Sequence, residues 1–326
     1  MGRTGLRVTP ICLGTTTFGL PADERTSLAI LDAADEAGIN FIDTADTYPM
    51  GGMDVGATER LIGAWLQGKR DRFVVATKGA GPMGTGPNDR GSSRAHLMRA
   101  IDESLRRLQT DYIDLYYVHQ WDMETPVEET LAALDEMRRA GKIRYAGVSN
   151  LSAWQLMKSL WTSDRRGYTR FDCVQARYNV LYRAFEAELV PAAVEYGVGL
   201  AVYNPLAGGL LTGRYQPGVE PDGSRFGARS PGVEVYRKRY YHEAALSLVA
   251  ELTRELRARG KSITHVALRW VIEQPGVTTA IVGASRPEQL RDTVRAMDLE
   301  LEEADRKACD DIWYKLPRRR PSEEDL

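Results

Sequence analysis

Four polar residues in this chain have the types and the spacing needed for proton-transfer chemistry. Asp43, Lys78 and His119 each end or closely follow a short apolar run, and Tyr48 lies shortly after Asp43. Short runs rich in β-branched and aromatic residues, bounded by turn residues, are typical of buried parallel strands. In a (β/α)8 barrel the reactive side chains stand at the C-terminal ends of different strands. The spacing therefore predicts that these four side chains gather at one rim.

Together these residue types can form a tuned proton donor. A tyrosine has an ordinary pKa of about 10, and a nearby ammonium lowers it by favouring the phenolate. Lys78 is the candidate cation beside Tyr48, and Asp43 is the candidate charge partner of Lys78. His119 could donate a hydrogen bond to a carbonyl oxygen, and Trp121 is a candidate for the same substrate site. Each residue alone is more often a packing or surface residue, so the combination carries the hypothesis.

Alternating strand and helix patterns predict the scaffold that would position these groups. The expected strands are Ile11 to Leu13, Phe41 to Asp43, Phe73 to Thr77, Ile113 to Val118, Ile143 to Gly147, Cys173 to Ala176, Gly199 to Tyr203 and Thr279 to Val282. Such alternation favours an α/β fold with a closed (β/α)8 TIM barrel. A doubly wound open sheet is the alternative, but the segment after the first strand lacks the GxGxxG spacing of that fold.

Local signals mark helix starts and two additions to a minimal barrel. The stretches 125–128 and 152–155 read as capping boxes, the first with Pro126 at the first helical position. Residues 211–241 form a long Gly-, Pro- and Arg-rich segment, and a tail follows Trp313. Long loops in a compact fold are usually functional. We expect both segments over the C-terminal rim, although the tail could equally be a frayed terminus.

Composition narrows the classes of function. The chain has 326 residues, 43% of them hydrophobic, and a formal net charge of -2, which gives no electrostatic reason to expect nucleic acid or a membrane partner. Cys12, Cys173 and Cys309 are widely spaced, which suggests neither disulfides nor a metal site. No long apolar segment is present at the N-terminus. A cytoplasmic protein acting on a small molecule is the simplest expectation.

The chain resembles the aldo-keto reductase superfamily from Leu13–Gly19 through Gly283–Leu290. Within it, the sequence is most similar to the branch with the potassium channel β subunits, the aflatoxin aldehyde reductases and bacterial reductases, including deoxysugar ketoreductases. The resemblance implies one (β/α)8 domain over residues 1–326 that reduces an aldehyde or ketone with NADPH. It also implies that Asp43, Tyr48, Lys78 and His119 form the catalytic tetrad, with no metal.

The resemblance further implies a set of NADP(H) contacts at the rim. Polar side chains there would fix the nicotinamide, glycines would let backbone amides approach the pyrophosphate, and a helix N-terminus with Ser285 and Arg286 would hold the 2′-phosphate. Ser285 could also cap that helix through a capping box. The implied contacts are Thr15, Thr16, Asp43, Ser149, Asn150, Gln175, Tyr203, Asn204, Pro205, Leu206, Gly208, Leu210, Gly213, Arg214, Arg225, Gly283, Ser285, Arg286, Gln289, Asp292 and Thr293.

Two departures and two rival functions accompany the resemblance. Asp292 and Thr293 stand where many relatives have Glu-Asn at the adenine, and Met1 leaves little room for the N-terminal hairpin that closes the barrel floor. A nucleotide-sensing subunit is one rival, although such relatives typically carry Asn where this chain has His119. A Schiff-base lyase using Lys78 is the other, and Asp43 argues against it. The carbonyl substrate, whether a sugar, a quinone or an aryl aldehyde, and the oligomeric state are left open.

Overall fold

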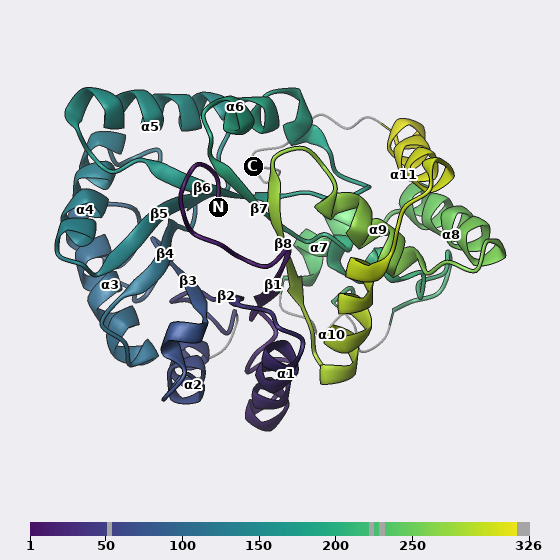
Figure 1. Cartoon of the computed structure of the whole chain (residues 1–326), viewed down its shortest axis with the longest axis horizontal. Coiled ribbons are helices and arrows are strands. Elements are labelled where there is room, and N and C mark those ends of the chain that lie inside the picture. The colour runs from purple at the N-terminus through teal and green to yellow at the C-terminus, as the bar shows by residue number, and fades with distance from the viewer. Residues whose placement is uncertain (51–53, 222–224, 228–231, 318–326) are drawn as a thin grey trace.

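The computed structural model, which describes residues 1–50, 54–221, 225–227 and 232–317, contains a closed barrel of parallel strands in sequential order (Figure 1). The strands are β1 (Ile11–Gly14), β2 (Phe41–Asp43), β3 (Val74–Gly79), β4 (Ile113–Val118), β5 (Ile143–Ser149), β6 (Phe171–Arg177), β7 (Gly199–Tyr203) and β8 (Val277–Gly283). Leu13 pairs with Ile42 on one side and with Val282 on the other, which closes the ring. The predicted barrel is therefore confirmed, and the open sheet is excluded.

Strand side chains alternate between the barrel interior and the surrounding helices. Tyr117 packs with Cys12 and Cys173 in an inner cluster, whereas its neighbour Tyr116 belongs to the outer core. The helices are α1 (Glu24–Glu36), α2 (Ala57–Trp65), α3 (Arg94–Leu108), α4 (Val127–Arg139), α5 (Ala153–Arg166), α6 (Leu189–Glu195), α7 (Val233–Tyr240), α8 (Glu243–Ala258), α9 (Ile263–Ile272), α10 (Pro287–Val294) and α11 (Glu303–Lys315). The inner cluster and the outer core together hold the strand ends that carry the candidate site.

The capping box predicted at residues 125–128 is wrong. α5 begins after Ser152, whose backbone N–H donates to Gln155 Oε1 at 2.7 Å, as the sequence predicts. At α4, however, Pro126 is the N-cap residue and lies outside the first helical turn. The Thr125 hydroxyl donates instead to Asp122 Oδ2 at 2.7 Å. A competing carboxylate in the preceding loop thus removes the cap that the local pattern suggested.

The chain forms a compact turn after Met1, where the sequence leaves little room for a floor hairpin. Met1 is 7% exposed and packs in the inner cluster with Cys12. The Arg3 backbone N–H donates to Gly197 O at 2.7 Å, and Gly2 has a φ of +50°. A Cβ atom on Gly2 would lie 2.5 Å from the same Gly197 oxygen, so only glycine fits this close approach. The chain crosses the barrel axis here, at the centre of Figure 1.

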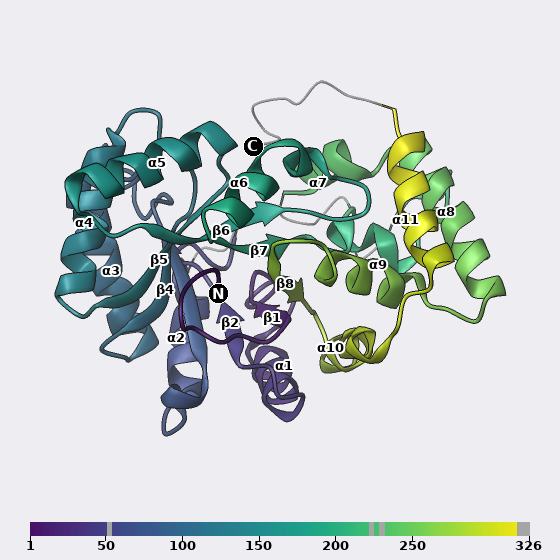
Figure 2. The ribbon, with the colours of Figure 1, turned by 45° about the horizontal axis from the view of Figure 1, so that its top comes forward.

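The two long additions pack differently. Within the segment 211–241, α7 turns back onto the loop after β6, where Asn179 Nδ2 donates to Tyr240 Oη at 3.2 Å. Residues 222–224 and 228–231 lie outside the described residues. α11 lies beside α8, on the outside of the barrel (Figure 2). Residues 318–326 of the tail also lie outside the described residues, so the expected cover over the rim stays a prediction.

Candidate active site

A buried ion pair forms the base of the candidate site. Lys78, near the end of β3, donates from Nζ to Asp43 Oδ1 at 2.5 Å and to the Thr44 backbone oxygen at 2.7 Å. The side chains of Lys78 and Asp43 are 0% and 3% exposed. Parallel β2 and β3 lie side by side, so their C-terminal ends bring these opposite charges together.

Tyr48 and His119 lie next to this pair. Lys78 Nζ is 5.2 Å from the centre of the Tyr48 ring, and the rings of Tyr48 and His119 are 6.2 Å apart at an interplanar angle of 73°. The loop holding Tyr48 is fixed by backbone bonds, from its N–H to Ala45 O at 3.2 Å and from the Gly56 N–H to its oxygen at 3.0 Å. The four sequence-predicted residues are thus brought together.

Burial sets the protonation states of the neighbours of Tyr48. Burial raises the pKa of the Asp43 carboxyl, while Lys78 and Gln175 oppose this rise. Burial disfavours the Lys78 ammonium, but Asp43 and Tyr48 outweigh it and leave the pKa of Lys78 raised. Burial and the charge of Lys78 lower the pKa of His119 to about 3. At neutral pH the site therefore holds a cationic lysine and an uncharged histidine.

Residues expected around the nicotinamide meet at the ends of β5, β6 and β7. Ser149 Oγ donates to the Gln175 backbone oxygen at 3.0 Å. Asn150 Nδ2 donates to the His119 backbone oxygen at 3.0 Å, and Tyr203 Oη donates to Asn150 Oδ1 at 2.8 Å. These bonds fix Asn150 in a left-handed conformation with a φ of +55°. The expected carboxamide set and the stacking tyrosine are thus one connected cluster.

The sequence did not predict two contacts of Asp43. Gln175 Nε2 donates to Asp43 Oδ2 at 2.7 Å, across 132 positions of sequence. Thr15 is fully buried, and both its hydroxyl and its backbone N–H donate to the Asp43 backbone oxygen at 3.0 Å. Thr16, the next residue, is partly exposed. Thr15 therefore supports the end of β2 as well as lying where a cofactor contact is expected.

The loop expected over the pyrophosphate has the backbone that such a role requires. Asn204, Gly208 and Gly213 have φ values of +56°, +68° and +71°, around the short helix η3 (Ala207–Thr212). Pro205 and Leu210 are buried, and Leu206 is partly buried. Asn204 Nδ2 is buried without a hydrogen-bond partner in the described part of the chain. An unsatisfied buried amide beside a glycine-rich turn fits a polar ligand.

Two arginines lie close to this loop. The Arg214 guanidinium lies 4.8 Å from the centre of the Tyr215 ring, and Arg214 is exposed. Arg225 Nη1 donates to Tyr236 Oη at 2.7 Å. The Tyr236 ring packs against Gly208, where an added Cβ atom would lie 2.8 Å from it. Tyr236 therefore connects Arg225 to the glycine-rich turn.

At the last strand, the structure corrects the expected cap. Arg286, not Ser285, is the N-cap residue of α10, and Pro287 occupies its first turn. The Ser285 backbone N–H and hydroxyl both donate to Gln289 Oε1, at 2.8 and 3.0 Å. Ser285 therefore bonds to Gln289 and does not cap α10, so the predicted capping box is wrong. Gly283 and Arg286 are exposed at this helix N-terminus.

The residues expected at the adenine lie one turn further along α10. Asp292 Oδ1 is 3.3 Å from His265 Nε2, and the Thr293 hydroxyl donates to the Gln289 backbone oxygen at 2.6 Å. Thr293 is buried, whereas Asp292 is exposed. Asp292 is thus the more accessible of the two, and the adenine contact stays a prediction.

Comparison with known proteins assigns the family. The model of the aldo/keto reductase family matches residues 10–314. The chain belongs to the aldo/keto reductase family. Its barrel and the cluster around Lys78 agree with an oxidoreductase enzyme, the class to which this family belongs.

Curated relatives extend over almost the whole of this aldo/keto reductase. It is 39% identical over 320 residues to the uncharacterized oxidoreductase YrpG of Bacillus subtilis, covering 96% of this chain and 94% of the relative. It is 34% identical over 310 residues to a probable voltage-gated potassium channel subunit beta of Oryza sativa subsp. japonica, covering 92% and 90%. It is 32% identical over 323 residues to norsolorinic acid reductase of Aspergillus flavus, covering 94% and 78%. The named branches of the resemblance are therefore confirmed.

The aldo/keto reductase also has an aromatic neighbour of Trp121 that the sequence did not indicate, Trp154. Trp121 is partly buried, and its ring lies 6.0 Å from that of Trp154, which is 56% exposed at the start of α5. The sequence pattern predicted a helix start at Ser152, but it did not predict a contact between Trp121 and Trp154, two positions after Ser152. In the described part of the chain, no His, Cys, Asp and Glu group could hold a metal ion, and no helix is long and apolar enough to cross a membrane.

Proposed function

We propose that this aldo/keto reductase reduces an aldehyde or ketone to an alcohol with NADPH, and that Tyr48 donates the proton. The observation that carries the proposal is the buried Lys78–Asp43 pair beside Tyr48, with Lys78 Nζ 5.2 Å from the ring centre. A fixed ammonium stabilises the phenolate that proton donation leaves behind. Tyr48 is thus the side chain that we expect to act as the general acid.

His119 and Trp121 would orient the substrate. An uncharged imidazole can donate one hydrogen bond to the carbonyl oxygen without competing as a proton acid, and the pKa of about 3 keeps His119 in that state. Trp121, with Trp154 beside it, offers an aromatic wall for the remainder of the molecule. The carbonyl oxygen would then lie between Tyr48 and His119.

The rim residues fit the dinucleotide. The cofactor supplies the hydride when it is bound. Ser149, Asn150 and Gln175 would hold the carboxamide, and Tyr203 would stack on the nicotinamide ring. The buried amide of Asn204, which lacks a partner among the described residues, fits a polar group under the glycine-rich turn. Arg286 at the N-terminus of α10 would hold the 2′-phosphate. The other implied contacts named above would line the remaining length of the cofactor.

The test is Tyr48→Phe, assayed in single turnovers with a panel of carbonyl compounds. We expect a loss of at least about 10²–10⁴-fold in reduction, because the variant lacks the transferable proton. The dissociation constant for NADPH should stay close to that of the wild type, because the phenol is not an expected cofactor contact. A variant that keeps more than about a tenth of the wild-type rate would contradict the role of Tyr48.

The same panel of carbonyl compounds distinguishes the proposed reductase from the rival function. The similarity to potassium channel subunits makes a nucleotide-sensing protein the second candidate. Wild-type protein that binds NADPH tightly but oxidises it with no member of the panel would favour this candidate over the reductase.

A further inference from the structure

Gln175 is the residue whose contacts the expected chemistry does not explain. Residues at this position are expected to hold the nicotinamide carboxamide, yet the Gln175 amide nitrogen donates to Asp43 Oδ2 at 2.7 Å. Lys78 Nζ donates to the other oxygen, Asp43 Oδ1, at 2.5 Å. Gln175 and Asp43 are 5% and 2% exposed. The carboxylate of Asp43 is therefore held on both oxygens by groups from two other strands.

The contact matters because Asp43 is buried. A buried carboxylate keeps its charge only when hydrogen bonds and a cation replace the lost water. Gln175 is the neutral donor in this arrangement, and Lys78 is the cation. A glutamine amide has two N–H groups and one acceptor oxygen. One N–H group faces Asp43, which leaves the second N–H group and the oxygen for a carboxamide. Gln175 can thus serve Asp43 and the cofactor together.

We propose that Gln175 is a positioning residue that couples the seat of the nicotinamide carboxamide to Asp43, and through Lys78 to the proton donor Tyr48. The proposal rests on the proposed reductase function. Seating the cofactor fixes Gln175, which fixes Asp43, which holds Lys78 beside the phenol. Binding of the hydride donor therefore helps to hold Lys78 beside Tyr48, the proton donor.

The charged and titratable groups that face Asp43 leave its carboxyl as the group that titrates at acid pH. They are Lys78 from β3, Cys12 from β1, Tyr117 from β4, and Tyr48, which faces Lys78 from the loop after β2. Burial raises the pKa of Cys12 and of Tyr117, so both stay neutral. Removing the Gln175 bond should raise the pKa of Asp43 further, because that bond favours the charged form.

The first test is Gln175→Met, which keeps the length of the side chain but removes the donor. With NADPH saturating, the acid limb of kcat should move to higher pH by about one to two units, the size expected for a hydrogen bond to a charged group. Ser149→Ala is the matched control, because Ser149 is expected at the same carboxamide and has no bond to the Asp43 side chain. It should weaken NADPH binding and leave the acid limb in place. Equal movement of the limb in both variants would overturn the proposal.

The second test needs no turnover. Unfolding by urea is measured without cofactor between about pH 4 and 8, for wild type and for Gln175→Met. An acid with a raised pKa in the folded state costs stability as pH rises, up to that folded pKa. The folded-state pKa of Asp43 should be higher in the variant, so the variant should lose stability over a wider pH range than the wild type. The difference in the free energy of unfolding between the two proteins should therefore widen as pH rises and then level off.

Asp43→Asn supplies the decisive background. In that background no carboxyl titrates, so the stability gap caused by Gln175→Met should not change with pH. A gap that is independent of pH already with Asp43 in place would overturn the coupling. A gap that behaves as expected in a protein without reductase activity would support the coupling and refute the proposed function, which keeps the two failures apart.

Discussion

Glu59 and Asp46 are two further carboxyl groups beside β3, and among the described residues only Glu59 has an ion pair with a cation. Glu59 accepts from Thr77 Oγ1 and from Arg107 Nε, both at 2.6 Å. Asp46 is fully buried, and neither of its oxygens has a hydrogen-bond partner among the described residues. Burial and then Glu59 raise the pKa of Asp46 well above its ordinary range. The Asp46 carboxyl is therefore shifted toward its neutral form, and Asp43 is the carboxyl that is paired with Lys78.

The neutrality of His119 is testable through stability. A histidine with a pKa of about 3 in the folded state binds a proton more weakly there than in the unfolded chain, where its pKa is about 6.5. His119 therefore costs no stability above about pH 6.5. As pH falls below this value the unfolded state gains protons, and wild type should lose stability relative to His119→Gln by up to about 1.4 kcal/mol per pH unit. Urea unfolding of both proteins from pH 7 to 4 measures the gap, and a constant gap would refute the prediction.

The N-terminus of α10 is the element that should choose between the two nicotinamide cofactors. Its N-cap residue Arg286 is exposed, and the strand–turn–helix connection directs free backbone N–H groups to the same place. Arg291, further along the helix, is held by Glu36 at 3.0 Å. Arg286 is thus the better placed guanidinium for a 2′-phosphate.

Arg286→Ala should raise the dissociation constant for NADPH about ten- to a hundredfold and leave that for NADH almost unchanged. The reason is that a charge-assisted bond to a phosphate contributes about 1.5–3 kcal/mol, and NADH lacks that phosphate. Fluorescence titration with both dinucleotides measures the effect, which should shrink with added salt. Arg291→Ala is the control and should change neither affinity much. An equal loss for both cofactors in Arg286→Ala would show that Arg286 supports the fold or the pyrophosphate.

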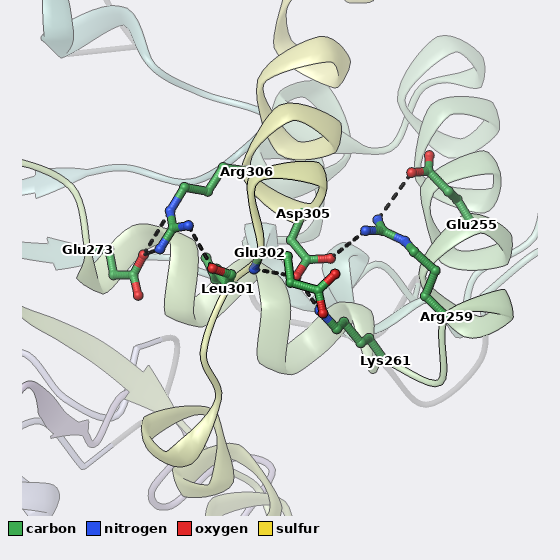
Figure 3. A network of polar contacts seen from close by, with 8 residues as sticks. All are labelled: Glu255, Arg259, Lys261, Glu273, Leu301, Glu302, Asp305 and Arg306. Carbon is green, nitrogen blue, oxygen red and sulfur yellow. Dashed lines mark hydrogen bonds and ion pairs between the residues drawn. The ribbon is translucent and has the colours of Figure 1, made fainter.

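At the scale of the whole molecule, a polar network fastens α11 to the outside of the barrel (Figure 3). Asp305, in the first turn of α11, accepts from Lys261 Nζ at 2.5 Å and forms an ion pair with Arg259 Nη1 at 2.7 Å. Arg306 bonds to Glu273 Oε2 at 2.7 Å, on the residue that follows α9. α8, α9 and α11 are thus joined by charges that lie away from the candidate site.

Asp305→Asn should lower the free energy of unfolding by about 1.5–3 kcal/mol at pH 7, because it removes a buried charge with cationic partners. Burial raises the pKa of Asp305, but Lys261 and the Glu302 N–H outweigh it and leave the pKa lowered. The contribution is therefore complete above the unfolded pKa of about 3.9 and is lost as pH falls through the lower folded value. Asp311→Asn, on the exposed Lys307 pair of the same helix, should cost less than about 0.5 kcal/mol. Urea unfolding at pH 7 and pH 3 measures both variants, and equal losses would contradict the prediction.

The sequence alone determined the barrel and the grouping of the tetrad. Apolar runs bounded by turn residues report buried strands directly, because burial on both faces leaves little choice of residue type. The ends of those strands then had to meet at one rim, which brought Lys78 to Asp43 and His119 to Tyr48. Strand ends such as Val74–Gly79 differ from the expected ones by only one or two residues.

Only the tertiary structure decided which partner each polar side chain takes. Thr125 and Ser285 match capping patterns, but their hydroxyls donate hydrogen bonds to Asp122 and Gln289 instead. Gln175 reaches Asp43 only because barrel closure places β6 opposite β2, 132 positions apart in sequence. Local sequence fixes backbone tendencies within a few residues, whereas a hydrogen bond depends on distance and burial. These quantities exist only once the barrel has closed.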